Sequence, residues 1–263
     1  MVNYEPKPFY TCADLVEIVK LLRAPGGCPW DREQTHASIR RDLLEEAYEV
    51  AEAIDEGSPE HLREELGDLL LQVVFHAVLS QEEGQFDLDA VADGVCKKLI
   101  YRHPHVFGDV TVGSTGEVLK NWEELKKKEK HQDSQADAVD AVARSLPALW
   151  RAEKVQKKAA KVGFDWPDVS GALDKVTEET SELRAAMDGA GDVGEEFGDL
   201  LFAAVNVGRF LKLDPEKSLT SATDKFAARF RKVEKAAKAQ GRALKDMTLA
   251  EMDALWDQVK KQA

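Results

Sequence analysis

One acidic sequence pattern occurs twice in this chain of 263 residues. The first copy has a Glu-Glu pair at residues 45–46 and Glu-Glu-Leu-Gly-Asp-Leu at residues 64–69. The second copy has Glu-Glu at residues 178–179 and Glu-Glu-Phe-Gly-Asp-Leu at residues 195–200, so the two parts recur at offsets of 133 and 131 residues. A repeat at nearly constant spacing predicts an internal duplication and two domains of the same fold.

Apolar residues recur at helical spacing through most of the chain, and no alternating run with a hairpin turn predicts a strand. The predicted fold class is therefore all-α, with two tandem helical-bundle domains related by internal duplication. Helix breakers and N-cap residues divide the pattern into helices at residues 13–23, 36–55, 59–83, 88–101, 147–162, 170–187, 192–212 and 215–240, with two more after the capping-box spacings Ser114/Glu117 and Thr248/Glu251.

Composition along the chain predicts where the domains lie. Residues 131–146 are polar and small, which predicts a linker between a first domain at 10–130 and a second domain at 147–262. Residues 69–74 and 200–205 are apolar on almost every side, so they need more cover than a surface helix receives. We expect them to be central helices of a bundle, or helices buried between the subunits of a homodimer.

Charge and cysteine usage narrow the functional class. The formal net charge is −13, which argues against a nucleic-acid polymer as the main partner. No apolar run of about 18 residues predicts a membrane span, and no signal peptide is recognised. The three cysteines, Cys12, Cys28 and Cys96, show no Cys-x-x-Cys spacing, so we expect structural thiols and a cytoplasmic location.

The repeated acids predict a metal site in each repeat. Residues three apart share a helix face, so each repeat can direct four carboxylates from two helices at one point. Like charges held that close call for a cation, and oxygen ligands without His or Cys favour Mg²⁺, with Mn²⁺ as the alternative. A single acidic pair is usually a solvated face, but recurrence in register favours binding. The predicted metal ligands are Glu46, Glu49, Glu65 and Asp68 in the first repeat and Glu179, Glu182, Glu196 and Asp199 in the second.

Basic and aromatic residues are also duplicated. A Lys and an Arg stand four apart in each repeat, and the two pairs are separated by 127 residues: Lys98 with Arg102, and Lys225 with Arg229. Each pair could clamp phosphate oxygens or could form an ordinary exposed basic face. Trp122 and Trp256 recur at an offset of 134 residues, and each could stack on a base or anchor the last helix. Together these features suggest a phosphorylated, base-bearing small molecule, although no P-loop and no Ser-His-Asp set is present.

Further motifs accompany the acidic ones along the chain. They are Gly-Gly-Cys-Pro-Trp-Asp at 26–31, Gln-Thr-His at 34–36, Leu-Leu-Glu-Glu at 43–46, Arg-His-Pro-His-Val-Phe at 102–107, Arg-Ser-Leu-Pro-Ala-Leu at 144–149, Val-Gly-Phe-Asp-Trp at 162–166 and the segment 225–229. In this order the motifs resemble those of the MazG family of nucleoside triphosphate pyrophosphohydrolases, and the resemblance covers about residues 10–262.

This resemblance implies an all-α enzyme with two tandem MazG-type domains that works as a homodimer. It implies Mg²⁺-dependent hydrolysis of nucleoside and deoxynucleoside triphosphates to the monophosphate and pyrophosphate, mainly in the C-terminal repeat. The residues expected to carry catalysis there are Glu178, Glu179, Glu182, Glu196 and Asp199, and those expected to contact the nucleotide are Lys175, Lys225, Arg229 and Trp256.

The first repeat keeps the four corresponding metal ligands. It also keeps the basic and aromatic residues expected to contact a nucleotide, Lys98, Arg102 and Trp122, so its activity stays open. It departs from the second repeat at Asp42, which stands where the second repeat has Lys175. Two other functions are compatible with the sequence. A helical adaptor would bind nucleotide without releasing pyrophosphate, and a metal-binding structural bundle would give Lys225 and Arg229 no role. The sequence does not decide between clearance of damaged nucleotides and control of signalling nucleotides.

Overall fold

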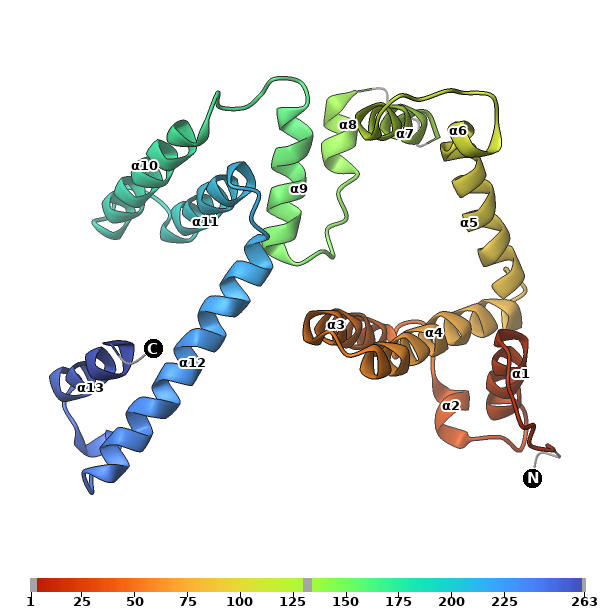
Figure 1. The fold of residues 1–263 in the computed structure, drawn as a ribbon, viewed down its shortest axis with the longest axis horizontal. Coiled ribbons are helices and arrows are strands. Elements are labelled where there is room, and N and C mark those ends of the chain that lie inside the picture. Colours follow the sequence, from red (N-terminus) through yellow and green to blue (C-terminus); the bar gives the residue numbers. More distant parts are fainter. Residues whose placement is uncertain (1–3, 130–133, 262–263) are drawn as a thin grey trace. The chain divides into compact units, whose positions relative to one another are not determined.

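The computed structural model describes residues 4–129 and 134–261. The described residues form helices, turns and loops without a β-strand, which confirms the predicted all-α class (Figure 1). The chain divides into two compact units, one ending at Lys126 and the other beginning at Lys127. In the described part of the chain, no helix is both long and apolar enough to cross a membrane.

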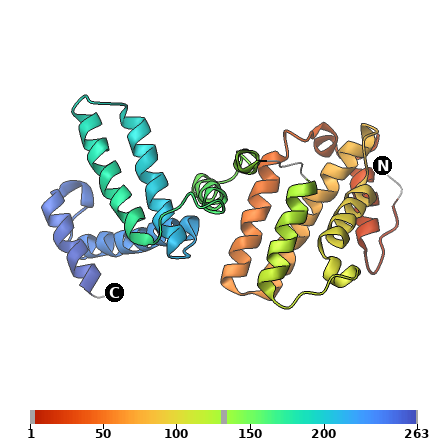
Figure 2. The same cartoon turned by 90° about the horizontal axis from the view of Figure 1, so that it is seen from above.

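The first unit is built around two long helices that pack against each other, α3 and α4. Figures 1 and 2 both show them side by side, and a tight turn at Gly57, with a positive φ of 69°, joins them. The helix α1 packs against α4. The helices of this unit are α1 (Cys12–Arg23), α2 (Pro29–Glu33), α3 (Arg40–Glu56), α4 (Pro59–Glu82), α5 (Leu88–Arg102), α6 (Pro104–Phe107) and α7 (Thr115–Glu129), whose last turn crosses the unit boundary.

The second unit repeats the paired long helices, here α10 and α11, which also lie side by side in both views (Figures 1 and 2). A second helix pair, α12 and α13, is joined through a short 3₁₀ turn, η1 (Leu244–Asp246). The helices of this unit are α8 (Gln135–Asp140), α9 (Ala148–Ala160), α10 (Val169–Met187), α11 (Val193–Phe210), α12 (Pro215–Ala239) and α13 (Leu249–Lys261).

Local hydrogen bonds fix the helix ends where the sequence places cap residues. The hydroxyl of Ser58 accepts from the backbone N–H of His61 before α4, as predicted from Ser58 and Pro59. The predicted capping box before α13 is also present, with Thr248 and Glu251 each accepting from the other's backbone N–H. Such caps satisfy N–H groups that have no partner inside the helix.

Several elements differ from the sequence prediction. The helix expected from residue 36 starts at Arg40, because the hydroxyl groups of Thr35 and Ser38 accept hydrogen bonds from each other's backbone N–H and hold a turn there. The short helices α2 and α6 and the 3₁₀ turn η1 were not predicted. Helix α8 lies inside the predicted linker, where a capping box of Ser134 and Asp137 starts it and Ala138 is buried. Residues 130–133 and 262, at the edges of the predicted domains and linker, lie outside the described residues.

Each unit has its own apolar core. The core of the first unit is formed by Val19 of α1, Ile39 and four residues of α4, which are Val74, Phe75, Val78 and Leu79. In the second unit a cluster of Val233, Ala237, Leu255 and Val259 joins α12 to α13. Burial of this apolar surface is the main force that holds the helices together.

The apolar segments expected to be central are covered on only part of their surface within the chain. On α4, Leu70 and Val73 remain exposed, and on α11 Leu201 and Phe202 remain exposed. The sequence analysis gave two alternatives for these segments, central helices of a bundle or helices buried between subunits. The described part of the chain does not bury them fully by itself. Large apolar side chains that share an exposed face are typical of surfaces that pair with another chain.

Gly27, in the Gly-Gly-Cys-Pro-Trp motif, is required by close backbone packing. A Cβ atom there would overlap the carbonyl oxygens of Leu21 and Leu22 at the end of α1. Gly27→Ala should therefore destabilise the first unit by about 2 kcal/mol or more, as measured by urea unfolding. Gly67→Ala is the control, because a Cβ there meets no described atom within 4 Å and alanine favours a helix by about 1 kcal/mol. Equal stability of the two variants would contradict the prediction.

A histidine pair, His36 and His76, is expected to make the stability of the first unit sensitive to acid. The Nδ1 atoms of His36 and His76 lie 2.7 Å apart, so one ring must donate and the other must accept. Burial, and then the neighbouring His36, lower the pKa of His76 below its ordinary 6.5. Below pH 6.5 the unfolded chain therefore binds more protons at this position than the folded chain, and stability falls as the pH falls.

We expect the melting temperature of the wild-type protein to drop more between pH 8 and pH 5.5 than that of His76→Leu. Thermal unfolding followed by circular dichroism at both pH values measures the difference. An equal drop in the two proteins would show that the histidine pair does not cause the acid sensitivity.

Candidate metal centre and nucleotide site

Two helix pairs carry the duplicated acids. In the second unit, Glu179 lies on α10, and Glu196 and Asp199 lie on α11. Because α10 and α11 pack along each other, carboxylates from both helices meet across the helix pair. One carboxylate oxygen from each of these three residues lies within 4.8 Å of the others, and we call this group the back cluster.

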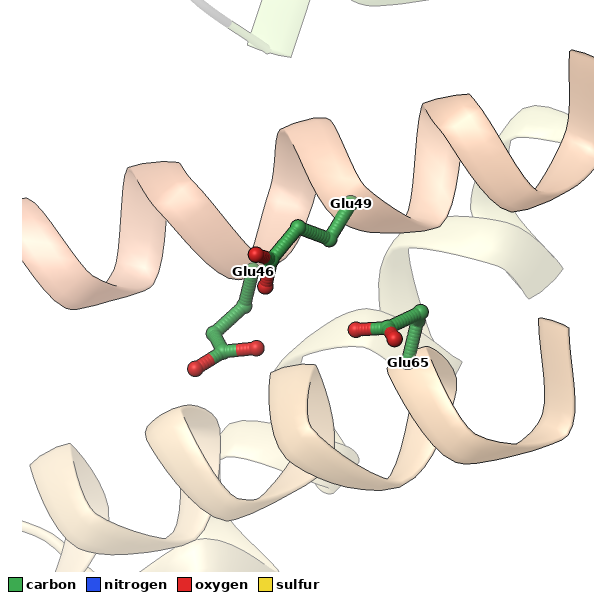
Figure 3. A group of neighbouring side chains, drawn as sticks. All are labelled: Glu46, Glu49 and Glu65. Carbon is green, nitrogen blue, oxygen red and sulfur yellow. The ribbon is translucent and has the colours of Figure 1, made fainter. Parts of the chain in front are cut away.

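The first unit contains the corresponding front cluster. Figure 3 shows Glu46 and Glu49 reaching from α3 toward Glu65 on α4, and one oxygen from each lies within 4.8 Å of the others. Burial raises the pKa of Glu46, and the negative charges of Asp68, Glu49 and Glu65 add to the increase. A carboxylate surrounded by other carboxylates is stabilised in its charged form when a cation binds between them.

Two of the eight predicted ligands lie outside these tight groups. Asp68 is close enough to Glu46 to raise its pKa, but it is not one of the three residues of the front cluster. Likewise, Glu182 interacts with Glu179 and Glu196 of the back cluster but is not one of its three residues. Partial desolvation raises the pKa of Glu182, and Glu179, Glu178 and Glu196 contribute to the rise although Lys175 opposes it. Both acids therefore border the clusters without completing them.

Glu179 is the most buried of the site carboxylates, with a relative exposure of 4%. A buried carboxylate needs a partner, and in this structure the partner is Lys175, whose Nζ lies 2.6 Å from Glu179. The same ammonium group lies 2.7 Å from Glu178 and 4.0 Å from Glu182. Hydrogen bonds to Glu178 and Glu179 raise the pKa of Lys175 above its ordinary value. These contacts place Lys175 and Glu178, both predicted site residues, next to the back cluster.

His61 is a site neighbour that the sequence analysis missed. Its Nε2 lies 3.0 Å from Glu65 of the front cluster, and its Nδ1 lies 2.7 Å from Glu56. These contacts, chiefly the one with Glu56, raise the pKa of His61. The spacing of His61 and Glu65, four residues apart on one helix, was the available sequence signal.

The basic and aromatic residues of the second unit lie on the α12–α13 pair. Lys225 is exposed, and neither Lys225 nor Arg229 makes an ion pair with another described residue. The Trp256 ring packs on the apolar cluster between α12 and α13, with its centroid 5.0 Å from that of Phe226. Trp256 therefore helps to pack α13 against α12, and no ion pair among the described residues joins Lys225 or Arg229 to the back cluster.

In the first unit the corresponding aromatic residue, Trp122, contacts one member of the basic pair, Arg102. The Arg102 guanidinium lies 5.5 Å from the centre of the Trp122 ring, and the ammonium group of Lys126 lies 4.8 Å from it. Lys98 lies on the same helix as Arg102 and is exposed. The contact of Arg102 with Trp122 joins α5 to α7, and the Trp122 ring has two cations near it.

The repeated glycines of the acidic motif have open surroundings. A Cβ atom added at Gly67 or at Gly198 would meet no described atom within 4 Å. Close packing of helices within the chain therefore does not explain the two glycines. Each glycine stands directly before an acid of the predicted ligand set, Asp68 or Asp199. Because glycine has no side chain, the helix surface at Gly67 and at Gly198 stays open.

The donor chemistry of both clusters fits a hard divalent cation. Each group offers three carboxylate oxygens without a sulfur or imidazole ligand, the set that Mg²⁺ and Mn²⁺ accept. Fold and site together define an all-α protein with a duplicated carboxylate centre on paired helices.

Comparison with known proteins identifies the family. The model of the MazG nucleotide pyrophosphohydrolase domain matches residues 34–107. The nucleoside triphosphate pyrophosphohydrolase/pyrophosphatase MazG of Thermotoga maritima is 45% identical over 247 residues, which cover 94% of each chain. The nucleoside triphosphate pyrophosphohydrolase of Escherichia coli K12 is 47% identical over 253 residues, covering 94% of this chain and 96% of the relative. This chain therefore belongs to the MazG nucleotide pyrophosphohydrolase family, and it is an enzyme of that family.

A crystal structure of a MazG-related protein from Thermotoga maritima is also similar to part of the chain. It is 31% identical, covers 44% of this chain and 98% of its own, and superposes with a TM-score of 0.38.

Proposed function

We propose that this protein hydrolyses nucleoside and deoxynucleoside triphosphates to the nucleoside monophosphate and pyrophosphate, with Mg²⁺ or Mn²⁺ bound in the back cluster. The observation that carries the proposal is the convergence of Glu179, Glu196 and Asp199 in a chain that is 45–47% identical to named pyrophosphohydrolases. Glu182 borders the cluster and is the proposed fourth ligand.

The divalent cation would neutralise triphosphate oxygens and acidify a bound water, as metal ions do in other phosphoryl-transfer enzymes. The protein then has to orient the water, hold the phosphates and stabilise the charge on the leaving pyrophosphate. Glu178, which pairs with Lys175 beside the cluster, is proposed to orient the attacking water. Lys225 and Arg229 are proposed to stabilise the leaving pyrophosphate, with Lys175 and Trp256 as further nucleotide contacts.

Pyrophosphate release is the direct test. Purified protein is incubated with each common nucleoside and deoxynucleoside triphosphate and Mg²⁺, and both products are measured. We expect equal amounts of monophosphate and pyrophosphate, and no product after the metal is removed with EDTA. Binding of nucleotide without product would support the adaptor function, and release of single phosphates would show that a different bond is broken.

We further propose that the protein works as a homodimer. The exposed apolar residues Leu66 and Val73 on α4, and Leu201 and Phe202 on α11, support pairing through the central helices. A second chain could also bring Lys225 and Arg229 to a back cluster that they do not contact within one chain. Sedimentation equilibrium should give about twice the chain mass of 29.2 kDa, and Leu201→Asp should lower it toward that of one chain.

The proposed surroundings follow from the same features. Small anionic nucleotides, held by a divalent cation, are the expected partners of a chain whose net charge is −13, rather than a nucleic-acid polymer. The cysteines Cys12, Cys28 and Cys96 are all free thiols, which supports a reducing cytoplasm as the location.

A further inference from the structure

The ammonium group of Lys175 takes the place of a cation beside the back cluster. Lys175, Glu178, Glu179 and Glu182 stand at positions i, i+3, i+4 and i+7 of α10, so they share one face of the helix. The Nζ of Lys175 lies 2.6 Å from Glu179 and 2.7 Å from Glu178. Because the Glu179 side chain is buried, its carboxylate needs a positive partner, and Lys175 supplies it.

A divalent cation and this ammonium group compete for the same carboxylate. Glu179 is both the partner of Lys175 and one of the three acids that meet within 4.8 Å. Two positive charges a few ångströms apart repel each other, even where one of them, like the Lys175 side chain at 37% relative exposure, is partly in contact with water. A divalent cation held by Glu179, Glu196 and Asp199 would therefore push the ammonium group out of its position.

We propose that Lys175 is a resident counter-ion that the divalent cation displaces, and that the displaced ammonium group then binds the triphosphate. The inference rests on the proposed function of the back cluster and adds an order of events to it. Metal binding frees a cation for the anionic substrate, and substrate binding in turn favours the state that holds the metal. Such coupling between two ligands is reciprocal.

The front cluster has no lysine at the position that corresponds to Lys175. Asp42 occupies the position that corresponds to Lys175, and it adds negative charge instead of a competing ammonium group. Among the described residues, the ion-pair partner of the front cluster is His61, which contacts Glu65 and is shared with Glu56. The two clusters should therefore differ in cation affinity, with the front cluster binding the cation without displacing a lysine.

Manganese binding to the full-length protein tests the proposal. Glu46→Gln and Glu65→Gln together silence the front cluster, and the free Mn²⁺ signal in electron paramagnetic resonance reports binding to the back cluster. In this background Lys175→Met should bind Mn²⁺ at least tenfold more tightly. Lys157→Met is the matched control. Lys157 also pairs with a glutamate four residues away on its helix, Glu153 of α9, at 2.7 Å, but it belongs to neither cluster. It should leave the affinity unchanged.

Nucleotide binding must change in the opposite direction. At saturating Mn²⁺, Lys175→Met should bind the non-hydrolysable α,β-methylene analogue of ATP at least tenfold more weakly, as measured by equilibrium dialysis. General damage to the site would weaken both ligands together. In the front cluster, with the back cluster silenced by Glu179→Gln and Glu196→Gln, Asp42→Lys should bind Mn²⁺ more weakly than Asp42→Asn, because only the former introduces an ammonium group.

The possible results separate this inference from the proposed function. Unchanged or weaker Mn²⁺ binding by Lys175→Met, with normal binding by the parent protein, would overturn the displacement of Lys175 and leave the metal site intact. Absence of Mn²⁺ binding at the back cluster of the parent protein would overturn the metal site in the proposed function, and the displacement with it.

Discussion

Replacement of Glu196 by Gln should reduce pyrophosphate release by at least about a thousandfold while the helical circular dichroism signal stays unchanged. Glu196 lies on α11, where one of its oxygens joins those of Glu179 and Asp199 within 4.8 Å. The amide that replaces the carboxylate has nearly the same size, but it removes one negative charge from the proposed metal site. Initial rates of pyrophosphate production at saturating Mg²⁺ measure the effect.

The duplication supplies the matched control for this variant. Glu65 occupies the corresponding position in the front cluster, on α4 (Figure 3). If the second repeat is the main catalytic unit, Glu65→Gln should retain most of the activity. Normal turnover by Glu196→Gln would exclude the back cluster as the catalytic site. A large loss in Glu65→Gln alone would move the catalytic site to the first repeat.

The second large effect is expected from the basic pair on α12. Replacement of both Lys225 and Arg229 by Met should lower kcat/KM by about a hundredfold or more, because each proposed charge-assisted contact to phosphate contributes about 1.5–3 kcal/mol. Neither residue makes an ion pair with another described residue, so their removal should not disturb the fold. Steady-state kinetics with a triphosphate substrate, together with Mn²⁺ binding, measure both consequences.

Mn²⁺ affinity should stay unchanged in this double variant, because the pair does not contact the acids within the chain. The corresponding double variant of Lys98 and Arg102 is the control in the first repeat, and it should have a smaller effect on kcat/KM. If removal of Lys225 and Arg229 left kcat/KM unchanged, the metal-binding structural bundle would become the better description of the second unit.

The sequence predicted the helices well because their signals are local. Apolar spacing and cap residues act within a few turns, so the positions of α4 and α13 followed from Ser58, Pro59 and the Thr248–Glu251 box. The failures have local causes as well. A turn held by Thr35 and Ser38 delays the start of α3, and a capping box at Ser134 starts α8 in a segment whose composition suggested a linker.

The approach of the acids to one another was predictable for the same reason. Residues three or four apart share a helix face, and the duplication indicated that both faces matter. The structure brings three acids of each predicted set together and leaves Asp68 and Glu182 at the edges. The difference depends on how the two helices of each pair are rotated, which periodicity alone does not fix.

By itself the sequence determined the all-α class and the acidic helix faces, because helix periodicity and capping are encoded over a few neighbouring residues. Only the tertiary structure decided that Glu179 is buried against Lys175, and that His61 contacts Glu65 of the front cluster. It also decided that, among the described residues, Lys225 and Arg229 make no ion pair with the acids. These relations depend on the packing of helices and on the competition of charges for a few partners. Residues far apart in the sequence meet only when the helices bury their apolar surfaces against each other, so helical periodicity does not reveal these contacts.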